Sequence, residues 1–162
     1  MNTVGRIASI NVSNGGVPKR PVEEGTVGWL GLTNDAQADT EHHGGPERAL
    51  CLYSLERIRS LQAEGHPIFP GAIGENITVE GLDWETVRPG VRLRLGDEVV
   101  IRITRYTTPC TTIRPFFAGG DYGRVSQKRY PGWARVYAGV VRPGRIRVGD
   151  RVTVLQEGEQ VS

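Results

Sequence analysis

Apolar and polar residues alternate along several short stretches of the chain, which is the spacing of β-strands. Residues 3–12, TVGRIASINV, form the first stretch, and the Asn-Gly-Gly sequence at 14–16 ends it. Residues 91–95 place valine and leucine on one face and arginine on the other, and the apolar alternation continues over residues 99–103. These patterns predict a mainly β protein in which each strand buries one face.

A further alternating segment covers residues 133–140. In it Ala134, Val136 and Ala138 alternate with Arg135 and Tyr137. This spacing predicts another strand with an apolar face and a polar face.

Two segments of the sequence resemble each other. Residues 87–99 contain VRPG followed by LGDEV, and residues 141–152 contain VRPG followed by VGDRV. Each spells a short strand, a Gly-Asp turn and another strand. We expect two similar β-hairpins within one closed or nearly closed barrel, and we assign the repeat to the scaffold rather than to function.

Helical spacing is clear at one place. The apolar run ALCLY at 49–53 predicts a buried strand, after which Ser54 can cap a helix. Leu55, Ile58 and Leu61 then share a helical face, and Gly65 is a natural stop. Twenty-two glycines and ten prolines favour tight loops elsewhere, so the expected fold is mainly β with a few short helices.

Length and composition limit the classes of protein. The 162 residues predict a single domain over 1–155, followed by a flexible tail over 156–162. The net charge of +2 is too small to indicate a nucleic-acid partner. We find neither a leader pattern nor a run of about 18 apolar residues, so we expect a cytoplasmic protein without a membrane partner. Two cysteines fit free thiols in a reducing compartment.

Cys110 is the strongest candidate for chemistry. It follows Pro109 and precedes residues 111–117, which can begin with a helical turn. The free N–H groups at the start of such a turn would stabilise a thiolate, which is the form that acts as nucleophile or soft metal ligand. The alternative is that Cys110 is a small buried hydrophobe. Cys51, inside ALCLY, is predicted to belong to the core.

Two further motifs have alternative interpretations. In EHHGGPER, residues 41–48, the adjacent histidines point to opposite sides of an extended chain, so we expect no zinc site. The glycine pair and Arg48 either bind an anionic ligand or form a solvated turn. In GAIGENITV, residues 71–79, Asn76 either bonds a heterocycle or holds its own turn.

The ordered set of motifs resembles the MOSC family, named for the C-terminal domain of molybdenum-cofactor sulfurase. Its pieces are GLTND at 31–35, HGGPERAL at 43–50, GAIGENITVEGL at 71–82, LRLGDEVVIRIT at 93–104, PC at 109–110 and GWARVYAGVVRPGRIRVGD at 132–150. Each piece is weak alone, whereas the ordered set is specific and spans most of the chain.

The resemblance implies a barrel-like fold and a site for the molybdenum cofactor, molybdopterin. Cys110 matches the family's cysteine, which is regarded as a sulfur carrier or as a ligand to molybdenum. The resemblance places His43, Gly44, Gly45, Arg48 and Asn76 near the cofactor. Lys19, in the GVPK loop, is a weaker candidate for contact with its phosphate.

One position departs from the pattern. Many relatives carry an arginine two residues before the proline of the PC motif, where this chain has Thr107. Arg105 or Arg114 would be the candidates to supply the missing charge. The departure leaves the substrate preference open.

The leading hypothesis from the resemblance is a cofactor-dependent oxidoreductase that reduces small N-hydroxylated substrates, with Cys110 as the molybdenum ligand. The alternative is a non-enzymatic carrier of cofactor or of persulfide sulfur on Cys110. A basic barrel that binds RNA is disfavoured, because aromatic residues do not interleave with the basic strand faces. The chain has no pyridoxal-phosphate domain, so an electron-donor protein or a cysteine desulfurase is the expected partner.

Overall fold

The computed structural model describes residues 2–36 and 46–157, in which short strands predominate. One α-helix, α1, covers Leu55–Ala63, and short 3-10 helices cover Pro46–Arg48, Trp84–Thr86, Thr111–Phe116, Ala118–Gly120 and Tyr122–Val125. The strands are β1 Val4–Val12, β2 Arg20–Val22, β3 Glu24–Gly28, β4 Gly31–Leu32, β5 Leu50–Ser54, β6 Ile77–Glu80, β7 Arg92–Leu95, β8 Val99–Tyr106, β9 Val136–Arg142, β10 Gly144–Arg147 and β11 Arg151–Val154.

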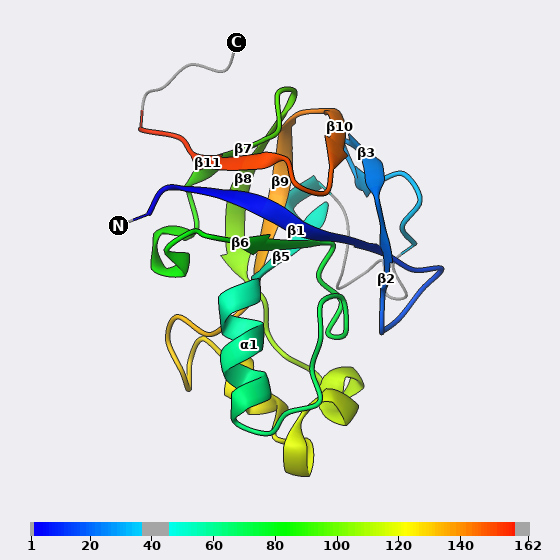
Figure 1. Ribbon diagram of the computed structural model, residues 1–162, viewed down its shortest axis with the longest axis vertical. Coiled ribbons are helices and arrows are strands. Elements are labelled where there is room, and N and C mark those ends of the chain that lie inside the picture. The colour runs from blue at the N-terminus through cyan, green and yellow to red at the C-terminus, as the bar shows by residue number, and fades with distance from the viewer. Residues whose placement is uncertain (1, 37–45, 158–162) are drawn as a thin grey trace.

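Seven strands close into a barrel. The main sheet has the order β11-β7-β8-β9-β5-β6-β1-β2, and β11 also pairs with β1, which closes the ring (Figure 1). The pairing of β5 with β6 is parallel, whereas the other pairings in the ring are antiparallel. Strands β10, β3 and β4 form a separate small sheet. The predicted mainly β barrel with a few short helices is therefore confirmed.

Helix α1 connects the two parallel strands β5 and β6 and lies beyond one end of the barrel (Figure 1). The Oγ atom of Ser54 accepts a hydrogen bond from the N–H of Arg57 at 3.1 Å, as expected of an N-cap. Ile58 and Leu61 are wholly buried. Gly65 has a φ of +100°, which suits glycine after a helix. The predicted cap, apolar face and stop are all confirmed.

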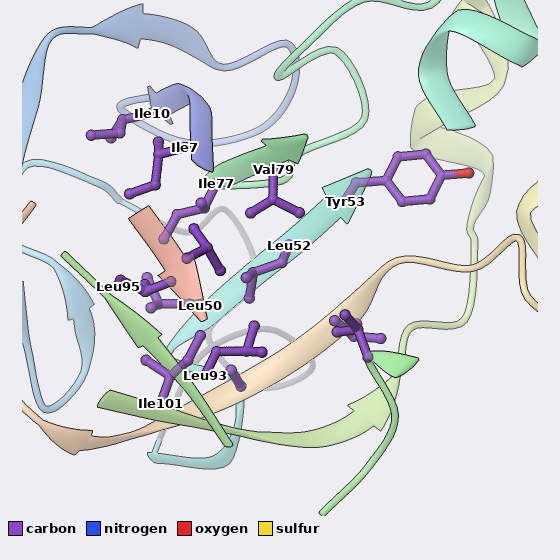
Figure 2. Packing of buried hydrophobic residues seen from close by; sticks show 14 of the residues in the cluster. Ile7, Ile10, Leu50, Leu52, Tyr53, Ile77, Val79, Leu93, Leu95 and Ile101 are labelled. Atoms are coloured by element: carbon purple, nitrogen blue, oxygen red, sulfur yellow. The ribbon is translucent and has the colours of Figure 1, made fainter. Parts of the chain in front are cut away.

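The core fills the barrel with branched aliphatic side chains. Figure 2 shows side chains from β1, β5, β6, β7 and β8 converging on one interior, and the labelled residues are Ile7, Ile10, Leu50, Leu52, Tyr53, Ile77, Val79, Leu93, Leu95 and Ile101. Tyr53 points away from the others, and its hydroxyl donates to the carbonyl of Trp133 at 2.6 Å. The alternation predicted for β7 and β8 is confirmed, because their leucines and isoleucines are buried.

The prediction of two hairpins is half right. Strands β7 and β8 pair as a hairpin, but β10 pairs with β3 while β11 pairs with β7 and β1. At the second Gly-Asp turn, Gly149 N donates to Ile7 O and Ile7 N donates to Asp150 O, both at 2.8 Å. The turn thus binds to β1 and carries the chain from the small sheet to the barrel. The similar local sequences therefore form a hairpin in one copy and connect two sheets in the other, because their strands have different tertiary neighbours.

Strand β9 begins at Val136, later than predicted, and the chain is buried on both faces over residues 134–138. Ala134, Val136 and Ala138 are buried, but Arg135 and Tyr137 are buried too. The face predicted to be polar is therefore buried as well. What it adjoins is the cavity described below.

Candidate functional site

A cavity of about 210 Å³ brings together residues from six segments of the chain. The residues that line it include four candidates predicted from the sequence: Lys19, Arg48, Asn76 and Cys110. Its other described lining residues are Gly16, Val17, Ala36, Cys51, Ile73, Gly74, Thr108, Thr112, Ile113, Arg135 and Tyr137. The candidates His43, Gly44 and Gly45 lie outside the described residues.

Cys110 directly precedes the 3-10 helix Thr111–Phe116, so the predicted helical turn is confirmed. Its carbonyl accepts from the N–H of Ile113 at 3.2 Å. The side chain is exposed, and Sγ lies 2.8 Å from Oγ1 of Thr112. Cys110 is therefore not the buried hydrophobe of the alternative interpretation. Cys51, by contrast, is buried in β5 as predicted, and burial raises the pKa of its thiol to about 11.

Asp35 organises one wall of the cavity. Its carboxylate accepts from Nζ of Lys19 at 2.7 and 2.8 Å, from the N–H of Ser13 at 3.0 Å and from Nδ2 of Asn76 at 2.9 Å. The side chains of Lys19 and Asp35 are only 8% and 3% exposed. The sequence reasoning missed Asp35, although this residue ends the GLTND motif and could have been found there.

Asn76 uses its amide within the protein. Oδ1 accepts from the N–H of Cys51 at 3.0 Å, while Nδ2 donates to Asp35. The asparagine therefore links β5 to the wall formed by Asp35 and Lys19. Of the two sequence interpretations, the geometry favours a side chain that holds the protein's own backbone in place.

Arg48 and Tyr137 stack at another part of the wall. The guanidinium carbon of Arg48 lies 5.7 Å from the centroid of the Tyr137 ring, within the range of a cation–π contact. Burial raises the pKa of Tyr137 to about 12, so its hydroxyl stays protonated at neutral pH. This wall thus combines a planar cation with an aromatic face.

Arg135 and Glu75 form a second charged group that sequence reasoning did not single out. Arg135 is buried, and its Nη1 donates to the carbonyl of Ile73 at 2.7 Å. Glu75 is wholly buried, and its Oε2 accepts from Oγ1 of Thr78 at 3.3 Å. Burial raises the pKa of Glu75 to about 7. Glu75 directly precedes Asn76 in the Gly-Glu-Asn motif, so the sequence could have indicated it.

Three or more His, Cys, Asp or Glu side chains do not converge anywhere in residues 2–36 and 46–157. Nor does any helix within these ranges have the length and apolar character needed to cross a membrane.

A model described as the MOSC domain matches residues 39–153, which is well over half of the chain. The chain belongs to the MOSC family. Solved structures of other proteins have a fold similar to that of this MOSC protein. It superposes on the YUAD protein from Bacillus subtilis with a TM-score of 0.73, 17% identity and 95% and 97% coverage of the two chains.

The MOSC chain also resembles YiiM from Geobacillus stearothermophilus, with a TM-score of 0.69, 24% identity and 95% and 76% coverage. Among curated proteins, the uncharacterized protein YflK of Bacillus subtilis (strain 168) is 32% identical over 147 residues, which is 90% of this chain and 65% of YflK. Protein YiiM of Escherichia coli (strain K12) is 33% identical over 122 residues, 72% of this chain and 53% of YiiM. The chain thus spans less than two thirds of either relative.

A more distant relative carries a functional name. A protein of Gibberella moniliformis (strain M3125 / FGSC 7600) named reductase is 28% identical to this MOSC chain over 131 residues, which is 78% of this chain and 23% of the reductase.

At Thr107, where the family resemblance led us to expect an arginine, the backbone pairs with another arginine of the chain. Neither Arg105 nor Arg114 lines the cavity, and both side chains are exposed. Arg135 does line the cavity, and its carbonyl accepts a hydrogen bond from the N–H of Thr107 at 3.0 Å. Arg135 is thus an arginine of the cavity wall whose backbone pairs with Thr107, and the role of Arg105 or Arg114 stays a prediction.

Proposed function

We propose that this MOSC protein is an oxidoreductase that holds a molybdenum cofactor in the cavity and reduces small N-hydroxylated compounds. The observation that carries the proposal is the presence of an exposed cysteine, Cys110, on a cavity wall that also includes Arg48 and Arg135. The name of the fungal relative, reductase, agrees with this class of reaction.

The chemistry of the lining residues fits such a cofactor. A thiolate is a soft ligand that suits molybdenum, and guanidinium groups bind phosphate through paired N–H donors. Thr107 Oγ1 and Arg135 Nε are buried polar atoms without a hydrogen-bond partner. This side of the site can therefore form further hydrogen bonds with a ligand. Cys110 would hold the metal, and Arg48 and Arg135 would bind anionic groups.

The bound cofactor would supply the two-electron change. In the net reaction an N–O bond breaks, two electrons and two protons are consumed, and an N–H product and water leave. The protein would orient the substrate against the Arg48–Tyr137 stack, and Thr112 would fix the direction of the Cys110 sulfur through their 2.8 Å contact. Electrons would come from a partner protein.

Molybdenum content tests this proposal. Wild type, Cys110→Ser and Cys51→Ala are each produced in a host that makes the cofactor, and the metal per folded chain is measured. We expect close to one molybdenum in wild type and in Cys51→Ala, and at least a tenfold loss in Cys110→Ser, since a serine hydroxyl is a poor ligand for a soft metal. Turnover of an N-hydroxylated base with a chemical reductant should follow the metal.

A second function is favoured by the exposure of Cys110 if no metal is found. The sulfur of Cys110 could accept a sulfane sulfur from the persulfide of a cysteine desulfurase, which would be left with its thiol. Folded protein without molybdenum, but with one extra sulfur atom on Cys110 by mass spectrometry, would support this carrier. Bound metal without turnover would overturn the enzyme proposal.

A further inference from the structure

Arg135 is a buried cation whose hydrogen-bonding capacity is only partly used. Its side chain is 7% exposed and lines the cavity. Nη1 donates to Ile73 O, whereas Nε is buried and has no partner. Within residues 2–36 and 46–157 no carboxylate forms an ion pair with Arg135. A buried charge of this kind is unfavourable unless a counter-ion reaches it.

Glu75 provides a nearby carboxyl that is equally incomplete in its contacts. It is wholly buried, and its Oε1 has no hydrogen-bond partner. Burial raises its pKa to about 7, while the backbone N–H groups of Gly71 and Glu75 and the charge of Arg135 act in the opposite direction. The hydrogen bond from Arg135 to the carbonyl of Ile73 reaches the chain two residues before Glu75. The charge of Glu75 therefore changes near neutral pH, close to a cation that lines the cavity.

The other ionisable groups in this region do not change their charge near neutral pH. Cys51 and Tyr53 of β5 both feel the charges of Glu75 and Arg135, but burial raises the pKa of Cys51 to about 11 and raises that of Tyr53 further. Both side chains therefore stay neutral near pH 7. Lys19 and Asp35, which also act on Cys51, are already paired with each other.

We propose that the Arg135 side of the cavity is a binding subsite for a small oxyanion, and that the buried Glu75 carboxyl sets its affinity. With Glu75 neutral, the guanidinium attracts an anion into the cavity. With Glu75 ionised, the two protein charges largely cancel, and the anion binds more weakly.

The shared chemistry of the ligand is an oxyanion presented to the donors of a guanidinium. Its source is either a carboxylate on the substrate or a phosphate on the cofactor. Assignment to the substrate rests on the proposed function, and it would make the substrates N-hydroxylated acids. The charge relation between Glu75 and Arg135 does not depend on any cofactor, so it can be tested on protein made without one.

Alkylation of Cys110 measures the local charge directly. Iodoacetate and iodoacetamide react alike, the thiolate displacing iodide to form a C–S bond, but only iodoacetate is an anion. The ratio of their rates at Cys110, determined by peptide mass spectrometry, cancels the fraction of thiolate and reports the attraction for an anion. For wild type we expect the ratio to fall roughly three- to tenfold between about pH 6 and about pH 8.5.

Four variants make the result specific. Arg135→Gln should lower the ratio at about pH 6 by roughly three- to tenfold, and Arg135→Lys should largely retain it. Glu75→Gln should keep the ratio high at both pH values. Arg105→Gln removes an exposed arginine that does not line the cavity, and it should leave the ratio unchanged. Circular dichroism and thermal melting verify that each variant is folded.

The proposal is overturned if the ratio in Arg135→Gln equals that of wild type, if Arg105→Gln changes it as much, or if its pH dependence persists in Glu75→Gln. A last arm uses acetate and inorganic phosphate to protect Cys110 from iodoacetamide. Protection by acetate assigns the subsite to a carboxylate and protection by phosphate to a phosphate. Protection by neither at about pH 6 also overturns it. None of these outcomes depends on molybdenum content.

Discussion

At the scale of single residues, the cavity is surrounded by charged side chains that are buried. Lys19 and Asp35 satisfy each other, whereas Arg135 and Glu75 retain atoms without partners. The first pair therefore contributes mainly to the shape of the site. The unpartnered atoms of the second pair lower the stability of the fold, so a role in binding explains this pair more readily than a structural role does.

Asp35→Asn tests the structural role of the first pair. The substitution leaves the ammonium group of Lys19 buried without a counter-ion, so we expect a loss of about 3–5 kcal/mol in the free energy of unfolding. Asp121→Asn is the control, because Asp121 pairs with Arg129 at 3.5 Å with both side chains about half exposed. Its cost should stay below about 1 kcal/mol. Urea unfolding measures both, and equal losses would contradict the structural role of Asp35.

Glu75 predicts a particular dependence of stability on pH. Its pKa is raised from an ordinary 4.5 to about 7, so the folded protein holds this proton more tightly than the unfolded chain does. The contribution is fully present below about pH 4.5 and is lost as the pH rises through 7, by roughly 3 kcal/mol in total. In Glu75→Gln the side chain does not titrate, so the stability of the variant does not fall with pH for this reason. The difference in unfolding free energy between variant and wild type should therefore grow in favour of the variant between pH 5 and pH 8. A constant difference would contradict the prediction.

The sequence revealed residue chemistry better than residue partners. Cys110 was recognisable from the proline before it and the turn after it, and Cys51 from its apolar neighbours. Asp35 and Arg135 were missed, although both stand in quoted motifs, because the ion pair of Asp35 with Lys19 and the hydrogen bond of Arg135 to Ile73 join residues separated in the sequence. The three candidates His43, Gly44 and Gly45 stay predictions.

At the scale of elements, close contacts between strands depend on particular glycines. A Cβ atom built on Gly5 of β1 would overlap the carbonyl oxygen of Glu80 in β6 and lie 3.0 Å from the N–H nitrogen of Leu82. On Gly28 of β3, the nearest atom to such a Cβ would be the carbonyl oxygen of Gly31 at 3.8 Å. Neither glycine has a positive φ, so the two positions differ mainly in space.

Gly5→Ala should therefore destabilise the protein by about 1–3 kcal/mol, because β1 must shift away from β6. Gly28→Ala should be neutral or stabilise by up to about 1 kcal/mol, since it reduces the freedom of the unfolded chain. Thermal melting of the two variants gives the comparison. Similar melting temperatures would contradict the close approach of β1 and β6.

Element prediction succeeded where the signal was local. The Ser54 cap, the burial of Ile58 and Leu61 and the β7–β8 hairpin all follow from neighbours in the sequence. The second hairpin failed because the partner of β10 is β3, more than a hundred residues earlier. Strand alternation also could not show that the second face of β9 adjoins a cavity rather than solvent.

At the scale of the whole molecule, the cavity lies mostly among segments outside the barrel strands. Most residues of the cavity lie in loops or at strand ends, such as Lys19, Asn76 and Cys110. The hairpin repeat and the ordered motifs both predicted a barrel, and the motifs also predicted the family, whereas composition alone predicted only short strands. The closure itself could not be predicted from alternation, because it joins the first strand to the last.

That closure affects how the chain can fold as it is made. Val4 to Arg6 of β1 pair with Arg151 to Thr153 of β11, so nearly the whole described chain separates the two partners. At about 5–20 residues per second, ribosomal synthesis leaves this part of β1 without its partner for roughly 7–30 seconds. During that interval its backbone donors and acceptors form an open edge that other chains can pair with. The nascent protein is therefore most exposed to aggregation just before its last strand emerges, and chaperone contact should matter most then.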